Sequence, residues 1–194
     1  MKKQNCIYLA GLLAATVCLP AHADEPLLTA LNGNKETRMN MNDTLIKKAN
    51  EAITKLREEG YSCSQATLIG ISRVLGSELT ENQLKAMSAG FRGGIGKTYE
   101  DGTCGALTAG VMALGLYTPN DNDKGMTLAG ELFKHFKNTY GTVKCGDIVG
   151  KFKFTKCTGC CLCMGEKVVE LLQRESIQLP QASTVAWNDI TDNK

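Results

Sequence analysis

The chain has 194 residues, with 22 Lys plus Arg, 20 Asp plus Glu and nine cysteines. Without its first 23 residues it loses two lysines and no acidic residue, so the remaining 171 residues are formally neutral. A nucleic-acid-binding protein normally carries a basic surplus on one face, and this balance argues against that class of partner. A chain of this size buries a core without the help of disulfides, so its cysteines need another explanation.

The N-terminus has the pattern of an export signal. Lys2-Lys3 precedes an apolar run from Ile7 to Leu19, and Ala21-His22-Ala23 is a small-x-small cleavage site. A membrane anchor is the alternative, but a spanning helix needs about 20 apolar residues and this run is shorter. We therefore expect a signal peptide (1–23), an exported, periplasmic protein and no stable membrane span after cleavage.

The spacing of apolar residues in the rest of the chain predicts an all-α fold. We expect a leader segment (24–42), a cysteine-containing helical domain (43–176) and a polar C-terminal tail (177–194). Helical periodicity predicts a compact bundle of about five or six helices. They cover residues 43–60, 62–75, 80–90, 104–116 and 126–140, and a last helix follows the cysteine group at 157–163.

Helix-start signals fix two of these helices. Ser62 with Gln65, and Thr80 with Gln83, have the spacing of a capping box, in which the first side chain caps the helix and the second reaches back. A glycine-rich loop (90–102) then leads to the helix that begins at Cys104.

Two further segments carry expectations about packing. Small residues fill one helix (104–116), and each glycine there lowers helix propensity, so we place this helix at the centre of the bundle where neighbours approach closely. Alternating lysine and phenylalanine at 151–156 predicts a short strand or extended segment before the last helix.

Seven cysteines remain after signal removal. They are Cys63, Cys104, Cys145, Cys157, Cys160, Cys161 and Cys163. Thiols tend to pair outside the cytosol, and seven cysteines leave one without a partner in the same chain. Any single one of them has an ordinary alternative role as a small buried apolar residue.

Several of these cysteines stand where helices begin. A helix N-terminus favours the thiolate, so we expect a lowered pKa for Cys63, for Cys104 and for one of Cys160 and Cys161 behind Thr158. Nearby lysines should add to this effect around Cys145 and Cys157. These lysines are Lys144, Lys151, Lys153 and Lys156. The pattern therefore indicates nucleophilic or metal-binding sulfur.

Helical periodicity separates the last four cysteines. Cys161 shares a face with Met164, Val168 and Leu172, so we expect it to point inward. The remaining three, Cys157, Cys160 and Cys163, form overlapping C-x-x-C spacings and are interpreted as an accessory set. No histidine follows any of these pairs, which excludes a c-type haem, and His135 is expected to be a surface or boundary residue.

The motifs together resemble the C-GCAxxG-C-C family of redox-active proteins over residues 45–173. The matching pieces are Tyr61–Ala66, Gly90–Gly96, Gly102–Ala106, Gly110, Met112–Leu116, Tyr140-Gly141 ahead of Cys145, and a final cysteine before Val168–Leu172. The resemblance implies a small helical domain whose cysteines are redox active or hold a cluster. By position these are Cys63, Cys104, Cys145 and Cys161. The glycine here follows Cys104, and the final cysteine is a group of four, which leaves Cys160 as an alternative fourth member.

Three functions remain open from the sequence. The first is thiol/disulfide or electron-transfer chemistry with a redox partner protein, which would make the chain an oxidoreductase. The second is a metal-binding module, in which Cys63, Cys104, Cys145 and Cys161 (or Cys160) hold an iron–sulfur cluster or zinc. The third is a binding or structural protein stabilised by disulfides.

Overall fold

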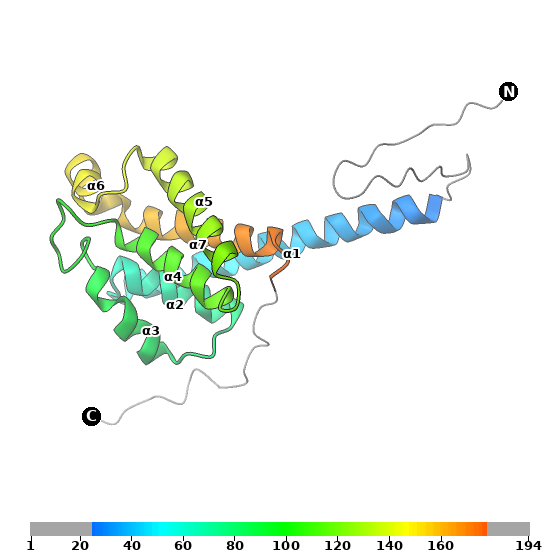
Figure 1. The fold of residues 1–194 in the computed structure, drawn as a ribbon, viewed down its shortest axis with the longest axis horizontal. Coiled ribbons are helices and arrows are strands. Elements are labelled where there is room, and N and C mark those ends of the chain that lie inside the picture. The colour runs from blue at the N-terminus through cyan, green and yellow to red at the C-terminus, as the bar shows by residue number, and fades with distance from the viewer. Residues whose placement is uncertain (1–24, 178–194) are drawn as a thin grey trace. The chain divides into compact units, whose positions relative to one another are not determined.

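The computed structural model describes residues 25–177, with side chains from Met41 onward (Figure 1). The chain divides into two compact units, Met1–Met41 and Asn42–Lys194. The expected signal peptide (1–23) and all but the first residue of the expected tail (177–194) lie outside the described residues. The cysteines discussed below all belong to the second unit.

Every regular element in the described part of the chain is helical, which confirms the predicted all-α fold. The elements are α1 (Glu25–Glu58), α2 (Cys63–Leu75), α3 (Glu81–Ser88), the 3₁₀ helix η1 (Ala89–Phe91), α4 (Gly105–Tyr117), α5 (Asn122–Tyr140), α6 (Cys145–Phe152), the 3₁₀ helix η2 (Lys153–Lys156) and α7 (Cys157–Arg174). The only β-type pairing between residues 25 and 177 is an isolated bridge between Thr103 and Lys144. Helix α1 begins at Glu25, well before the expected start at Asp43.

Both predicted capping boxes are present. The Ser62 hydroxyl accepts the backbone N–H of Gln65 at 3.3 Å, and the Gln65 side chain accepts the backbone N–H of Ser62 at 3.2 Å. Thr80 and Gln83 make the same reciprocal pair at the start of α3. These bonds satisfy N–H groups that a helix start leaves without partners, so they set where α2 and α3 begin.

Helix α4 lies at the centre of the second unit, as its small residues predicted. It packs against α2, α5 and α7 (Figure 1). A Cβ atom added at Gly105 would collide with the Phe91 carbonyl oxygen and would lie 2.8 Å from the Cys63 sulfur. One added at Gly110 would lie 2.9 Å from a Leu132 methyl carbon. The absence of side chains therefore allows α2, η1 and α5 to approach α4.

Buried residues recur at helical spacing on the core-facing sides of α5 and α7. Leu128, Leu132 and Phe136 of α5 are buried, but Phe133 is 41% exposed and lies outside the core. On α7, Cys161 is buried together with the apolar residues that share its helical face, which confirms the expected inward direction.

The extended segment predicted for 151–156 is wrong. These residues form the end of α6 and the 3₁₀ helix η2. An extended segment needs a partner strand for its backbone groups, and the described chain offers none here, so local helical hydrogen bonds satisfy them instead. Phe154 is 64% exposed, whereas Phe152 packs against the core.

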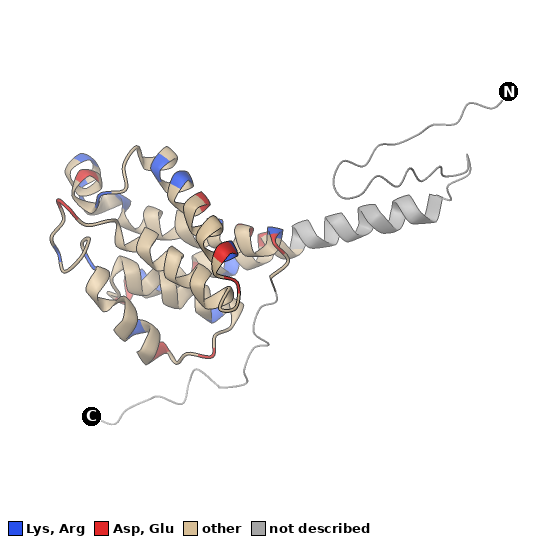
Figure 2. Ribbon diagram, in the orientation of Figure 1, with Lys and Arg blue, Asp and Glu red and all other residues tan. Residues whose placement is uncertain are grey.

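Charged residues of both signs occur on the same helices (Figure 2). Glu81 and Lys85 share α3, and Asp123 and Lys137 share α5. A search of the described residues for a helix long and apolar enough to cross a membrane finds none.

The two ends of α4 provide a test of its packing. Gly105→Ala should lower the free energy of unfolding by about 1–3 kcal/mol, because the new methyl group collides with the Phe91 carbonyl. Gly115→Ala is the matched control, since no atom of another element lies within 4 Å of the place its methyl group would take, and it should raise the free energy by about 0.5–1 kcal/mol. Urea denaturation of both variants measures the difference, and equal effects would contradict the close approach.

Candidate functional site

Four helices of the second unit begin at a cysteine. Cys63 is the first residue of α2, Cys145 of α6 and Cys157 of α7, and Cys104 is the N-cap residue of α4. The expectations that a helix start lies just behind Thr158 and that the last helix follows the cysteine group are wrong, because α7 begins at Cys157. Because η2 leads directly into α7 at Cys157, Cys160 and Cys161 lie one turn inside that helix.

Backbone hydrogen bonds join two of these helix starts. The Cys104 N–H donates to the Val143 carbonyl, and the Cys145 N–H donates to the Gly102 carbonyl, both at 2.8 Å. The pair encloses the bridge between Thr103 and Lys144. The start of α4 is thereby fixed against the start of α6.

Sulfur contacts bring α2 and α7 into the same region. The fully buried Cys161 thiol donates to the Cys157 carbonyl at 3.1 Å and lies 3.5 Å from the Cys63 carbonyl. The Cys104 thiol interacts with the Cys160 side chain, one turn further along α7. We call the six cysteines that meet here the thiol cluster, which consists of Cys63, Cys104, Cys145, Cys157, Cys160 and Cys161. All six are free thiols in the structure.

A small cavity opens onto one side of the thiol cluster. Its volume is about 120 Å³, and Cys63, Cys145 and Cys157 line it together with Arg57 and Arg92. The other three cysteines of the cluster are 6% exposed or less, and none of them lines the cavity. A small molecule in this cavity would therefore meet three thiols from three helices.

Burial keeps Cys63, Cys145, Cys157 and Cys161 protonated at neutral pH. It is the largest cause of the raised pKa of Cys63, Cys157 and Cys161, and it raises the pKa of Cys145 to about 12. For Cys104, the hydrogen bond with Cys160 raises the pKa even more than burial does. A negative charge on one thiol opposes ionisation of its neighbours, which adds to the effect.

The expectation that helix starts lower the pKa of Cys63 and Cys104 is therefore wrong. Backbone N–H groups in the first turns of α2 and α4, those of Ser64 for Cys63 and of Ala106 and Leu107 for Cys104, do lower the pKa of these thiols, but the opposing effects raise it by more. The cation that lowers the pKa of Cys63 and Cys157 is Arg57. The four lysines expected to act here are all exposed and are not among the causes.

The seventh cysteine, Cys163, lies on another side of α7. Its sulfur is 3.5 Å from Nε2 of His135 on α5. The Tyr140 hydroxyl interacts with both Cys160 and Cys163. Of the cysteines expected to be accessory, Cys157 and Cys160 therefore join the thiol cluster, and Cys163 faces α5.

The residues do not fit a metal ion as they are placed. Within residues described by the structure, no group of three or more His, Cys, Asp or Glu side chains is arranged to hold one. We derive no chemical step through a metal or cluster.

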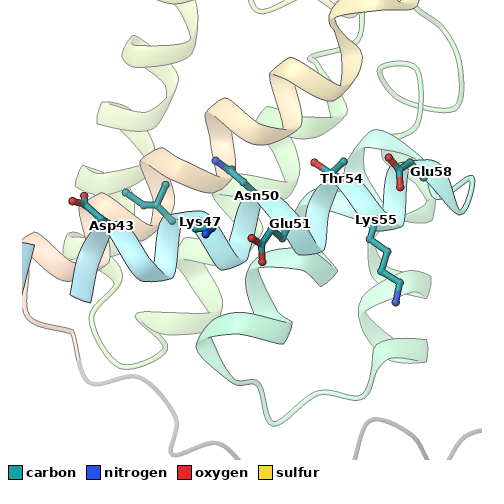
Figure 3. Close-up of a pocket in the computed structure, with 8 residues that line it drawn as sticks. Asp43, Lys47, Asn50, Glu51, Thr54, Lys55 and Glu58 are labelled. Atoms are coloured by element: carbon teal, nitrogen blue, oxygen red, sulfur yellow. The ribbon is translucent and has the colours of Figure 1, made fainter. Parts of the chain in front are cut away.

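A larger hollow, of about 850 Å³, runs along α1 (Figure 3). It is lined mainly by polar and charged residues, which Figure 3 shows along one helix, and it contains no cysteine. These side chains include Lys47, Glu51 and Lys55, which are exposed. Of these two hollows in the described part of the chain, only the smaller one is lined by cysteines.

Sequence reasoning gave no role beside a thiol to three residues that interact with these cysteines. Arg57 was expected only on a helix, Tyr140 on a helix and in the family motif, and His135 at the surface or boundary of the fold. Each reaches its cysteine across a helix–helix contact, so the spacing of residues along the chain carries no signal for it. The only signal in the sequence for these contacts is the helix of small residues (104–116), because small side chains indicate that neighbouring helices pack closely against it.

The sequence comparisons agree with the cysteine pattern. Residues 61–174 match the family model described as "Putative redox-active protein (C_GCAxxG_C_C)". The match covers more than half of the chain and includes all seven cysteines of the second unit. No curated protein and no solved structure matches the chain.

The raised thiol pKa values predict a loss of stability at alkaline pH. The folded-state pKa of Cys145, about 12, lies above the unfolded value of about 8.5, so its contribution is complete below that value and is lost as the pH rises toward 12. Between about pH 9 and pH 11 the free energy of unfolding should fall more steeply in the unmodified protein than in Cys145→Ser, by about 1.4 kcal/mol per pH unit. Urea denaturation under reducing conditions measures both slopes, and identical slopes would show that Cys145 ionises normally.

Proposed function

Because the chain belongs to the C_GCAxxG_C_C family, we propose that it is a redox protein that exchanges thiols and disulfides at the thiol cluster. The observation that carries the proposal is that cysteines at the starts of three helices, α2, α6 and α7, line one small cavity. Cysteines that served only as apolar core residues would have no reason to share a solvent-accessible opening. Such an arrangement gives an incoming sulfur atom several neighbouring thiols to react with.

The reaction is balanced by a disulfide on a partner protein. Two cluster thiols lose two protons and two electrons as their sulfur–sulfur bond forms, and the partner's disulfide takes them up and becomes two thiols. The reverse reaction oxidises the partner. The protein would then act as an oxidoreductase through its own sulfur atoms.

The contacts support a particular set of site residues. The resemblance assigned Cys63, Cys104, Cys145 and either Cys161 or Cys160 to the shared site. The interaction between the Cys104 and Cys160 side chains favours Cys160 as the fourth member, because a disulfide requires two sulfur atoms that can come into contact. Cys161 instead donates to two carbonyl groups and is completely buried.

Cys157 and Cys160 add a second pair with suitable geometry. They form a C-x-x-C unit at the start of α7, with the first thiol at the cavity and the second buried beneath it. Arg57 stabilises negative charge on Cys157. An incoming disulfide would therefore meet Cys157 first, and Cys160 would lie within reach to resolve the mixed disulfide.

A redox titration tests the proposed function. Free thiols are tagged with a mass label after equilibration at a series of potentials, and the unmodified protein should lose thiols reversibly in pairs. A two-electron step changes the ratio of oxidised to reduced protein tenfold for about 30 mV. Cys157→Ser and Cys160→Ser should each remove one such pair.

Metal analysis of the same anaerobically purified sample completes this test. If the number of tagged thiols is the same at all potentials, the proposal is contradicted. Disulfides that resist mild reductant would also contradict it, because they would indicate a purely structural role for the cysteines. Iron or zinc bound with untaggable thiols would identify a metal-binding module instead.

We further propose that the protein acts outside the cytosol, in the periplasm. The charged start, apolar run and small-x-small site of residues 1–23 support this location. Mass analysis of the protein recovered from the periplasmic fraction should give a chain that begins at Asp24. Recovery of the uncleaved chain in the cytosolic fraction would contradict export.

A further inference from the structure

The Cys163 side of α7 holds a second group of reactive side chains. Cys163 is half-buried, and its sulfur lies 3.5 Å from Nε2 of the half-buried His135. This is the spacing of a thiol and a base that can remove its proton. The proposed function makes no use of this pair.

Tyr140 links this pair to the thiol cluster. Its hydroxyl interacts with Cys160 and with Cys163, and a Cβ atom added at Gly159 would lie 3.9 Å from the hydroxyl oxygen. The ring is held by Phe136, with ring centroids 4.7 Å apart. The hydroxyl therefore lies against α7 between the buried cluster and the outer thiol.

Cys160 stands between two possible partners on its own helix. Cys157 is three residues before it and Cys163 three residues after it. Residues at this spacing in an α-helix have Cα atoms about 5 Å apart, within the range for a disulfide, although closing the bond requires the turn to tighten slightly. Cys160 can therefore pair in either direction.

From this arrangement we propose that Cys163, with His135 as its base, is an outer exchange site, and that Cys160 passes the disulfide between Cys163 and the cavity thiol Cys157. The inference rests on the proposed function, because it requires that the thiol cluster be redox active. Its substrate class is a disulfide that approaches the α5 side of α7.

The exchange proceeds in three balanced steps. Cys163 gives its proton to His135 and attacks the external disulfide, and the released thiolate takes up that proton. Cys160 then attacks the Cys163 sulfur, which forms the Cys160–Cys163 bond and releases the second external thiol with the Cys160 proton. Finally Cys157 attacks Cys160, which restores the Cys163 thiol and leaves a Cys157–Cys160 disulfide.

The surroundings of Cys163 explain why a base is needed. Burial and the neighbouring Glu166 carboxylate raise its pKa, and these effects outweigh the hydrogen bonds from Tyr140 and Thr139 and the charge of Lys167. The thiol is therefore protonated at neutral pH. Burial also raises the pKa of Tyr140, so the hydroxyl remains a neutral donor beside both sulfur atoms.

A trapping experiment tests the inference with glutathione disulfide as the probe. In Cys160→Ser the second step is blocked, so a glutathione adduct should accumulate on Cys163 and be located by peptide mass analysis. In the unmodified protein the adduct should be resolved, with loss of two free thiols. An adduct on Cys157 or Cys63, with Cys163 unmodified, would overturn the outer site while leaving the proposed function intact.

Rate measurements provide the second readout and do not depend on folding of the Cys160 variant. His135→Gln should slow the loss of thiols about tenfold or more at neutral pH, with the difference shrinking as the pH rises. Lys134→Gln, at an exposed position next to it, is the matched control and should react at the unmodified rate. Equal rates for the two variants would overturn the role of His135, and no thiol loss in the unmodified protein would overturn the proposed function as well.

Discussion

The geometry of the thiol cluster depends on the missing side chain at Gly105. With no Cβ at this position, the Phe91 carbonyl and the Cys63 sulfur can both lie against the first turn of α4. Cys104 immediately precedes this turn and contacts Cys160 on α7. Cys104 therefore supplies a thiol, and Gly105, the next residue, leaves the space in which the neighbouring helices can approach that thiol.

Local signals predicted much of the fold. The capping boxes at Ser62 and Thr80 predicted two helix starts, and the small residues of α4 predicted its central position. The short run at 151–156 was misread because alternation over six residues also fits a helix end followed by a 3₁₀ turn. The last helix was also expected after the cysteine group, whereas α7 begins at Cys157 and contains that group.

The candidate site was predictable only in part, because its contacts are tertiary. The inward direction of Cys161 followed from helical period, whereas the contacts of Cys160 with Cys104, and of Cys163 with His135, join residues far apart in sequence. The ionisation of the thiols was predicted with the wrong sign. Helix N-termini do favour thiolates, but a residue pattern does not reveal the cost of desolvation when six thiols are packed together.

The backbone bonds on either side of Thr103 and Lys144 have a consequence for the shape of the protein during a redox cycle. Cys104 and Cys145 are held in register by amide–carbonyl pairs, which do not change when sulfur atoms gain or lose electrons. The proposed exchange of disulfides therefore requires no change in the backbone hydrogen-bond partners of these two cysteines.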